Sequence, residues 1–212
     1  MIPRLIHVVW IGGKPNPHQD LLGSWTRLNP EWELRYWTDG TLPPMRHQRL
    51  IDKIPHWSGK VNVIRLELLH QFGGLYSDAD SECLKPLDPL VEGVRSLGMT
   101  GRKGNVQNAT LACEPGDPTY GRMLHDMPEW WRQLKASRRN TGRGVDFRAV
   151  FGTRYITRYL QADTKFVQID GGARNGSRRI ICEQHERCED TVIVHYMDQS
   201  WRAQLGGRRV RL

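Results

Sequence analysis

Residues 60–80 read KVNVIRLELLHQFGGLYSDAD, and this stretch decides the fold class. Its first part predicts a helix from Lys60 to Phe72, because apolar residues recur there at spacings of three and four. Gly73-Gly74 then provide a helix stop, and residues 75–77 form a short strand that runs directly into Asp78-Ala79-Asp80. A strand with acidic residues at its carboxyl end is typical of an open α/β sheet, where ligands bind beyond the strand ends.

The residues before this stretch add a β-α-β unit. Residues 5–11, LIHVVWI, are a near-continuous β-branched and aromatic run closed by Gly12-Gly13, which predicts a buried strand. Residues 19–28 are expected to be helical up to Asn29-Pro30, and residues 32–37 alternate as a second strand does. The order strand, helix, strand predicts a mostly parallel, doubly wound sheet.

The second half of the chain continues the same pattern. Strands are expected at residues 106–113, 166–169 and 191–195, and helices at residues 120–135 and 149–160. Pro128 lies inside the first of these helices and marks a place for a kink or a break. No internal repeat or low-complexity linker divides the sequence, so a single α/β domain over residues 1–212 is expected.

The composition is that of a folded, basic protein. Hydrophobic residues make up 38% and charged residues 25% of the 212 residues, which excludes a disordered chain. The formal net charge of +8 favours anionic partners such as nucleotide diphosphates, nucleic acid or lipid head groups. The basic residues gather in residues 132–148, 174–179 and 202–211. No secretory signal or membrane-spanning apolar run is visible, so a cytoplasmic protein is expected, with peripheral membrane contact as an alternative.

The four cysteines do not predict a disulfide framework. Cys182, His185 and Cys188 have a spacing that invites a zinc site, but a closed zinc site needs four ligands and no fourth ligand is evident. A turn with two free thiols, or one local disulfide, fits this segment better.

The acidic pair Asp78 and Asp80 suggests a divalent cation. In an extended segment, side chains two residues apart point to the same face of the strand. Two carboxylates alone would repel an anionic diphosphate, whereas Mg²⁺ or Mn²⁺ between them reverses that charge and stabilises a departing diphosphate. The motif by itself is a weak signal, because such a pair also occurs in solvated turns. Its position directly after a strand is what favours a ligand site.

The block from Arg65 to Asp80 resembles the corresponding block of glycosyltransferase family 32. This family of Asp-x-Asp sugar transferases includes yeast mannosyltransferases and bacterial capsule-sugar transferases, and the clostridial glucosylating toxins share the block. Residues 2–12 resemble the family's first strand, residues 29–39 its second strand, and residues 195–201 its closing segment. The resemblance runs from Ile2 to Trp201 and is densest in residues 1–90.

The resemblance implies a GT-A fold, a single Rossmann-like domain with a mostly parallel sheet flanked by helices. Residues 1–95 would bind the nucleotide-sugar, residues 96–201 would hold the acceptor, and residues 202–212 would be a basic tail. The implied activity is a metal-dependent, retaining transfer of a hexose. Its donor would be a UDP- or GDP-sugar, its cation Mn²⁺ or Mg²⁺, and its acceptor a glycan, a lipid-linked sugar or a protein.

The resemblance also assigns roles to particular residues. Asp80, Asp78 and His195 would form the metal site, and Asp78, Asp80 and Arg65 would act in catalysis. Trp10 would stack on the nucleotide base, since an indole offers a large rigid face. The remaining residues implied in binding the nucleotide-sugar are Ile11, Asn62, Arg65, Tyr76, Asp78, Asn108, Ser200 and Trp201.

Two departures from the family pattern concern specificity. The family usually has an Asp that binds the sugar three residues before the Arg, and here that residue is Asn62. An amide keeps a carbonyl oxygen and adds a donor but loses the charge, which leaves the donor sugar open. The family's later Gly-Pro before a helix is replaced by Gly152-Thr153, which leaves the acceptor open.

Retention by double displacement would need a carboxylate beneath the anomeric carbon. Glu67, Asp117 and Asp146 are the candidates, and none has a convincing context. Glu67 lies two residues from Arg65 on the same predicted helix and therefore does not share its face. Front-face transfer is the favoured hypothesis, with an oxygen of the leaving diphosphate taking the acceptor's proton.

Two alternatives stay open at this point. The first is a glycosyltransferase that acts on modified bases of DNA, because Trp130 and Trp131 lie beside the basic residues 132–148. The second is a non-catalytic module that binds a nucleotide-sugar or nucleic acid. The presence of Asp78, Asp80, Arg65, Trp10, His195 and Trp201 together argues against the second alternative.

Overall fold

The computed structural model describes residues 1–101, 104–139, 151–163, 166–170, 181–183 and 189–196. The central sheet has six strands in the order β2-β1-β3-β6-β5-β7. The strands are β1 (Leu5–Val9), β2 (Glu33–Trp37), β3 (Gly74–Ser77), β5 (Ser96–Thr100), β6 (Val106–Cys113) and β7 (Phe166–Asp170). Only β6 runs opposite to its neighbours, so this sheet is mostly parallel, as expected from the sequence.

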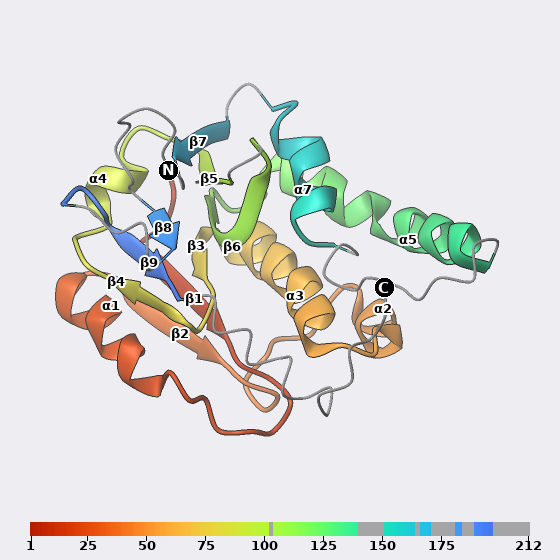
Figure 1. Cartoon of the computed structure of the whole chain (residues 1–212), viewed down its shortest axis with the longest axis horizontal. Helices are drawn as coiled ribbons and strands as arrows, with labels where there is room; N and C mark the ends of the chain where they lie inside the picture. The colour runs from red at the N-terminus through yellow and green to blue at the C-terminus, as the bar shows by residue number, and fades with distance from the viewer. Residues whose placement is uncertain (102–103, 140–150, 164–165, 171–180, 184–188, 197–212) are drawn as a thin grey trace.

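A second, smaller sheet lies beside the first. Its order is β4-β9-β8, formed by β4 (Ser81–Cys83), β9 (Ile193–His195) and β8 (Ile181–Glu183). Strand β4 follows β3 after the turn that contains Asp78 and Asp80, so this turn connects the two sheets. Figure 1 shows the small sheet on the side of the central sheet opposite α3.

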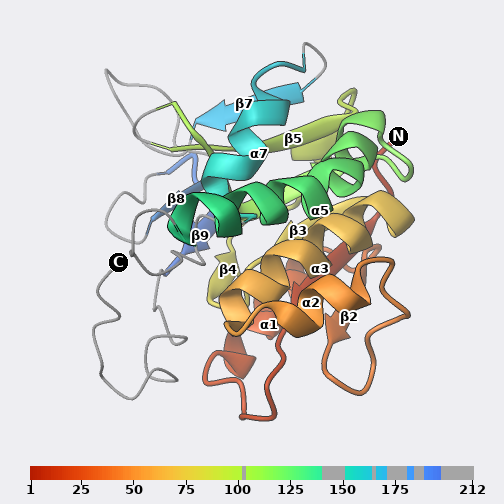
Figure 2. The same cartoon turned by 90° about the vertical axis from the view of Figure 1, so that its right-hand side faces the viewer.

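Helices cover both faces of the central sheet. The helices are η1 (Gln19–Leu21), α1 (Leu22–Leu28), α2 (Gln48–Lys53), α3 (Trp57–Phe72), α4 (Asp88–Val91), α5 (Pro118–Arg139) and α7 (Thr153–Leu160). Figure 2 shows α3, α5 and α7 on one face, with α3 and α5 side by side. The helix α1 and the small sheet occupy the other face. This is the mostly parallel sheet flanked by helices that the sequence predicts.

The alternation of side chains along the strands separates two hydrophobic clusters. Val9 and Tyr76 belong to the cluster under α3, α5 and α7, whereas Val8 and Leu75 belong to the cluster under α1 and the small sheet. Successive residues of a strand face opposite sides, so β1 and β3 are apolar on both faces. This explains why the two strands read as continuous apolar runs.

Glycines make the sharp connection from α3 to β3. Gly73 and Gly74 have φ values of 66° and 90°, which side chains with a Cβ rarely adopt. A Cβ on Gly74 would lie 2.4 Å from the carbonyl oxygen of Leu5. The helix therefore stops where the sequence predicts, and β3 approaches β1 closely.

The structure differs from the sequence expectations in detail. Helix α3 begins at Trp57, before the expected Lys60, and α5 continues through Pro128 without a break. Strands β4 and β5 were not predicted, because β5 contains a glycine and no alternating pattern and β4 is only three residues long. Within the described residues, none of the helices combines the length and the apolar character needed to cross a bilayer.

Candidate functional site

The turn after β3 brings the two acidic side chains to the edge of the central sheet. The amide of Ser81 donates to the carbonyl oxygen of Asp78 over 3.1 Å, which closes a tight turn. The expectation of an extended segment was therefore wrong, because the chain reverses here to enter β4. The amide of Asp78 still donates to Ala109 over 2.9 Å and holds the start of the turn against β6.

Strand pairing places His195 against this turn. In the antiparallel pair of β4 and β9, Ser81 lies opposite His195, and the amide of Tyr196 donates to the carbonyl oxygen of Asp80 over 2.9 Å. The His195 Nε2 atom is 3.1 Å from Asp80 Oδ1 and 3.7 Å from Asp78 Oδ2. Ligand atoms of the three residues all lie within 4.8 Å of one another. The structure thus brings together the three residues predicted to hold the metal.

The Asp78 carboxylate is held from behind by two residues. The Tyr76 hydroxyl donates to Asp78 Oδ1 over 2.8 Å, and Arg65 Nη2 lies 3.1 Å from the same oxygen. The Arg65 guanidinium also lies over the Tyr76 ring, 4.4 Å from its centroid. Both contacts go to Oδ1, so Oδ2 is the oxygen that lies near His195. Arg65 and Tyr76, which were expected to contact the nucleotide-sugar, both contact the carboxylate of Asp78.

The electrostatics of this cluster favour positive charge. Burial lowers the pKa of His195, but the hydrogen bond to Asp80 and the charges of Asp78 and Asp80 raise it, and the net change is upward. Burial also raises the pKa of Tyr76 well above its ordinary value, so its hydroxyl stays protonated and donates to Asp78. A site where two carboxylates stabilise an imidazolium would also stabilise a divalent cation.

A neutral polar network continues from Arg65 away from the metal cluster. Arg65 Nη1 donates to the backbone oxygen of Asn108, and Asn108 Nδ2 donates to Asn62 Oδ1 over 2.7 Å. Asn62 is only 3% exposed. The carbonyl oxygen that Asn62 could have offered to a sugar is therefore bonded to Asn108. Asn62, Asn108 and Arg65 thus form one hydrogen-bonded wall beside Asp78.

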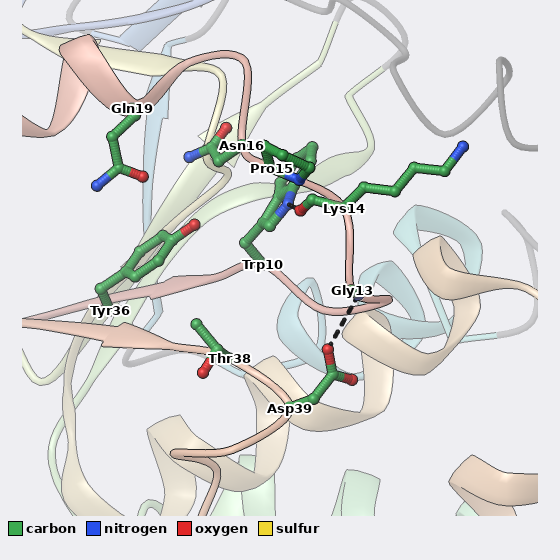
Figure 3. Close-up of a pocket in the computed structure, with 9 residues that line it drawn as sticks. All are labelled: Trp10, Gly13, Lys14, Pro15, Asn16, Gln19, Tyr36, Thr38 and Asp39. Atoms are coloured by element: carbon green, nitrogen blue, oxygen red, sulfur yellow. Dashed lines mark hydrogen bonds between the residues drawn. The ribbon is translucent and has the colours of Figure 1, made fainter.

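A pocket of about 470 Å³ lies beyond the end of β1 (Figure 3). Its walls are formed by Trp10, Gly13, Lys14, Pro15, Asn16, Gln19, Tyr36, Thr38 and Asp39. Because β1 and β3 are parallel neighbours, Trp10 and Asp78 leave the sheet at the same edge. Trp10 thus lines a pocket, as its predicted role requires, whereas Ile11 is 7% exposed and packs in the core.

Hydrogen bonds between side chains and backbone groups hold the pocket loop in place. Asp39 Oδ2 accepts hydrogen bonds from the amides of Gly12 and Gly13 at 2.8 and 3.2 Å. The Trp10 indole donates to the carbonyl oxygen of Lys14 over 2.6 Å. Sequence reasoning missed Asn16, Tyr36 and Asp39. The signal for Asp39 was its place directly after the second strand.

Two of the three acids considered as nucleophiles, Glu67 and Asp117, have structural partners. Glu67 accepts hydrogen bonds from the amides of Arg46 and His47 and lies 2.7 Å from the His47 imidazole. Asp117 accepts from the amides of Thr119 and Tyr120 at the start of α5. Asp146, Ser200 and Trp201 lie outside the described residues, as do the side chains of Cys182, His185 and Cys188.

The two tryptophans that suggested a DNA substrate are used for packing. Trp131 is 8% exposed within the core, and the Trp130 ring packs against Tyr155 at 5.4 Å. Arg132 pairs with Glu129 over 2.6 Å, and residues 140–148 of the basic segment lie outside the described part. The described residues therefore do not support a nucleic-acid partner.

Comparisons with known proteins agree with this geometry. Residues 15–97 match the family described as the glycosyltransferase sugar-binding region containing the DXD motif. The chain is 24% identical over 139 residues to inositol phosphoceramide mannosyltransferase 1 of Schizosaccharomyces pombe, and 26% identical over 138 residues to inositol phosphoceramide mannosyltransferase 3 of the same yeast. Each match covers 61% of this chain, and the chain spans 44% and 38% of those two proteins.

Solved structures show the same fold. The PaToxG glycosyltransferase superimposes with a TM-score of 0.52 at 16% identity, covering 75% of this chain and 69% of that one. The ligand-free glycosyltransferase domain of the YGT toxin superimposes with a TM-score of 0.56 at 8% identity, covering 79% of this chain and 80% of that one. A glycosyltransferase involved in the glycosylation of the major capsid of PBCV-1 superimposes with a TM-score of 0.50 at 11% identity, covering 96% of this chain and 98% of that one. The resemblance predicted from the sequence is confirmed.

Proposed function

Because residues 15–97 carry the sugar-binding region of the DXD glycosyltransferases, we propose that this chain transfers a hexose from a UDP- or GDP-sugar in a metal-dependent reaction. The observation that carries the proposal is the convergence of Asp78, Asp80 and His195 at the sheet edge where Trp10 lines a pocket. One end of this edge suits a cation with a diphosphate, and the other suits a base.

The residues present fit a divalent cation. Two carboxylates and one imidazole, with ligand atoms within 4.8 Å of one another, are donors that Mn²⁺ accepts readily, and Mg²⁺ accepts the oxygens. The bound cation would neutralise the charge that develops on the leaving diphosphate. Tyr76 and Arg65 fix the rotamer of Asp78 in advance, so the carboxylate loses little freedom when it binds.

The hydrogen bonds made by two of the candidate nucleophiles favour front-face transfer with retention. Glu67 and Asp117 are both buried and both accept backbone hydrogen bonds. Neither is free to attack an anomeric carbon, so double displacement would need another group. Trp10 would hold the base, and the wall of Arg65, Asn62 and Asn108 would lie along the donor. Residues 1–95 then form the donor half and residues 96–201 the acceptor half.

The relatives suggest which substrates to test first. Both yeast proteins are named inositol phosphoceramide mannosyltransferases. A mannosyl donor and a glycolipid acceptor are therefore the first pair to try, followed by other glycan, lipid-linked and protein acceptors. A cytoplasmic location stays a prediction, which cell fractionation would test.

The decisive experiment measures release of nucleoside diphosphate from a panel of UDP- and GDP-sugars with and without Mn²⁺. We expect one class of donor to be turned over, and this turnover should require the cation. Asp80→Ala should abolish that turnover, whereas Asp52→Ala, which changes an exposed acid on α2, should not. Full activity of the Asp80→Ala protein would contradict the proposed metal site.

A further inference from the structure

Two polar side chains in the Trp10 pocket have no role in the metal site. Asn16 Oδ1 accepts a hydrogen bond from the amide of His18 over 2.9 Å, which fixes the orientation of the Asn16 amide group. Its Nδ2 is buried and makes no hydrogen bond. Figure 3 shows this nitrogen on the side of the Asn16 amide that faces the Tyr36 hydroxyl. A buried donor without an acceptor is costly, so it points to a partner that the protein does not supply.

The Tyr36 hydroxyl adds a second donor at the same place. Burial raises the pKa of Tyr36, and the neighbouring Asn16 amide only partly offsets this, so the phenol is protonated at neutral pH. Asn16 Nδ2 makes no hydrogen bond to the phenol oxygen, so the amide and the phenol can each donate to a ligand. The pocket presents two donors beside the Trp10 ring.

We propose that Tyr36 and Asn16 select nucleotides by reading a ring carbonyl of the base. This inference rests on the proposed function, in which Trp10 stacks on that base. Uracil offers O4 and guanine offers O6 as acceptors, whereas cytosine and adenine carry an amino group at the matching position. An amino group facing two donors would leave these donors unpaired, which disfavours cytosine and adenine. Tyr36 and Asn16 therefore determine base specificity.

Titration calorimetry on the full chain with Mn²⁺ tests this base preference. It compares nucleoside diphosphates in pairs whose bases have the same ring size. We expect UDP to bind about tenfold more tightly than CDP, and GDP about tenfold more tightly than ADP, as one well-made hydrogen bond provides. Tyr36→Phe should bring at least one of the two ratios close to one. Tyr159→Phe removes a phenol hydroxyl that donates to Asp126, outside the pocket, and should leave both ratios unchanged.

A second variant tests the direction of the hydrogen bonds. Asn16→Asp keeps an oxygen for the His18 amide but replaces the donor by an acceptor, so the preference should shift toward CDP and ADP. The added negative charge would weaken all four diphosphates alike and would not change their ratios. Equal binding within both pairs by the unaltered protein, or ratios that survive Tyr36→Phe, would overturn the inference while leaving the glycosyltransferase proposal intact. Absence of binding by every nucleotide would overturn both.

Discussion

Acidification should destabilise the protein through His7, which is fully buried in β1. Trp37 Nε1 donates to His7 Nδ1 over 2.9 Å, and His7 Nε2 lies 2.9 Å from the carbonyl oxygen of Gly73. The ring therefore accepts at one nitrogen and donates at the other, which only the neutral form can do. Burial, aided by the charge of Arg35 and opposed by the Gly73 hydrogen bond, lowers the pKa of His7 from 6.5 to about 4.

The sign and size of the effect follow from linkage. The unfolded chain takes up this proton near pH 6.5 and the folded chain only near pH 4, so the unfolded state binds more protons in between. The free energy of unfolding should thus fall as the pH decreases through this window. The loss from His7 alone is about 2 kcal/mol at pH 5 and about 3 kcal/mol at pH 4.

Urea denaturation isolates the contribution of His7 to the free energy of unfolding. The unaltered protein and His7→Gln are unfolded between pH 7.5 and pH 4.5, and unfolding is followed by circular dichroism. Gln can still accept from Trp37 and donate to Gly73 but does not titrate. We expect the stability advantage of the unaltered protein over His7→Gln to shrink by roughly 2 kcal/mol on moving to pH 5. Parallel losses in the two proteins would refute the reasoning, because His7 would then titrate alike in the folded and unfolded states.

Three further substitutions test the site and its scaffold. His195→Gln should weaken Mn²⁺ binding at least about tenfold in a thermal-shift titration, because one of three converging ligand atoms is lost; unchanged affinity would place the cation elsewhere. Glu67→Ala should lower the free energy of unfolding in urea by about 3 kcal/mol, since two backbone amides and an imidazole lose their buried acceptor. A loss below about 1 kcal/mol would show that water replaces the carboxylate. Gly74→Ala should lower the free energy of unfolding by at least about 2 kcal/mol, because the φ of Gly74 is 90° and the new Cβ meets the Leu5 oxygen. Gly40→Ala, which meets nothing within 4 Å, is the matched control, and equal stability of the two variants would contradict this account.

Much of the scaffold could be predicted because its signals are local. The apolar spacing of α3 and the glycines that end it lie within one stretch of sequence, and the acidic pair follows directly. Strand β6 was predicted with its observed bounds, from a run of residues that pack on both faces. Each of these features depends on neighbours in the chain, which periodicity and turn chemistry report directly.

Other features were missed or misread because distant segments decide them. Trp130 and Trp131 look from the sequence like a basic aromatic surface, but packing against Tyr155 and the core occupies their rings. Asn16 and Tyr36 come from different segments and meet only because β1 and β2 are adjacent parallel strands. Position in the sequence gives no indication of either outcome.

The sequence by itself determined the elements with strong local signals, such as α3 and β6, and the place of Asp78 and Asp80 at the end of β3. Only the tertiary structure decided that Arg65 and Tyr76 hold Asp78, and that His195 faces Asp80. The physical reason is that hydrophobic periodicity records which face of an element is buried. The contacts of the site instead depend on the register of β4 with β9 and on the turn between two sheets, which are set by pairing across the whole chain.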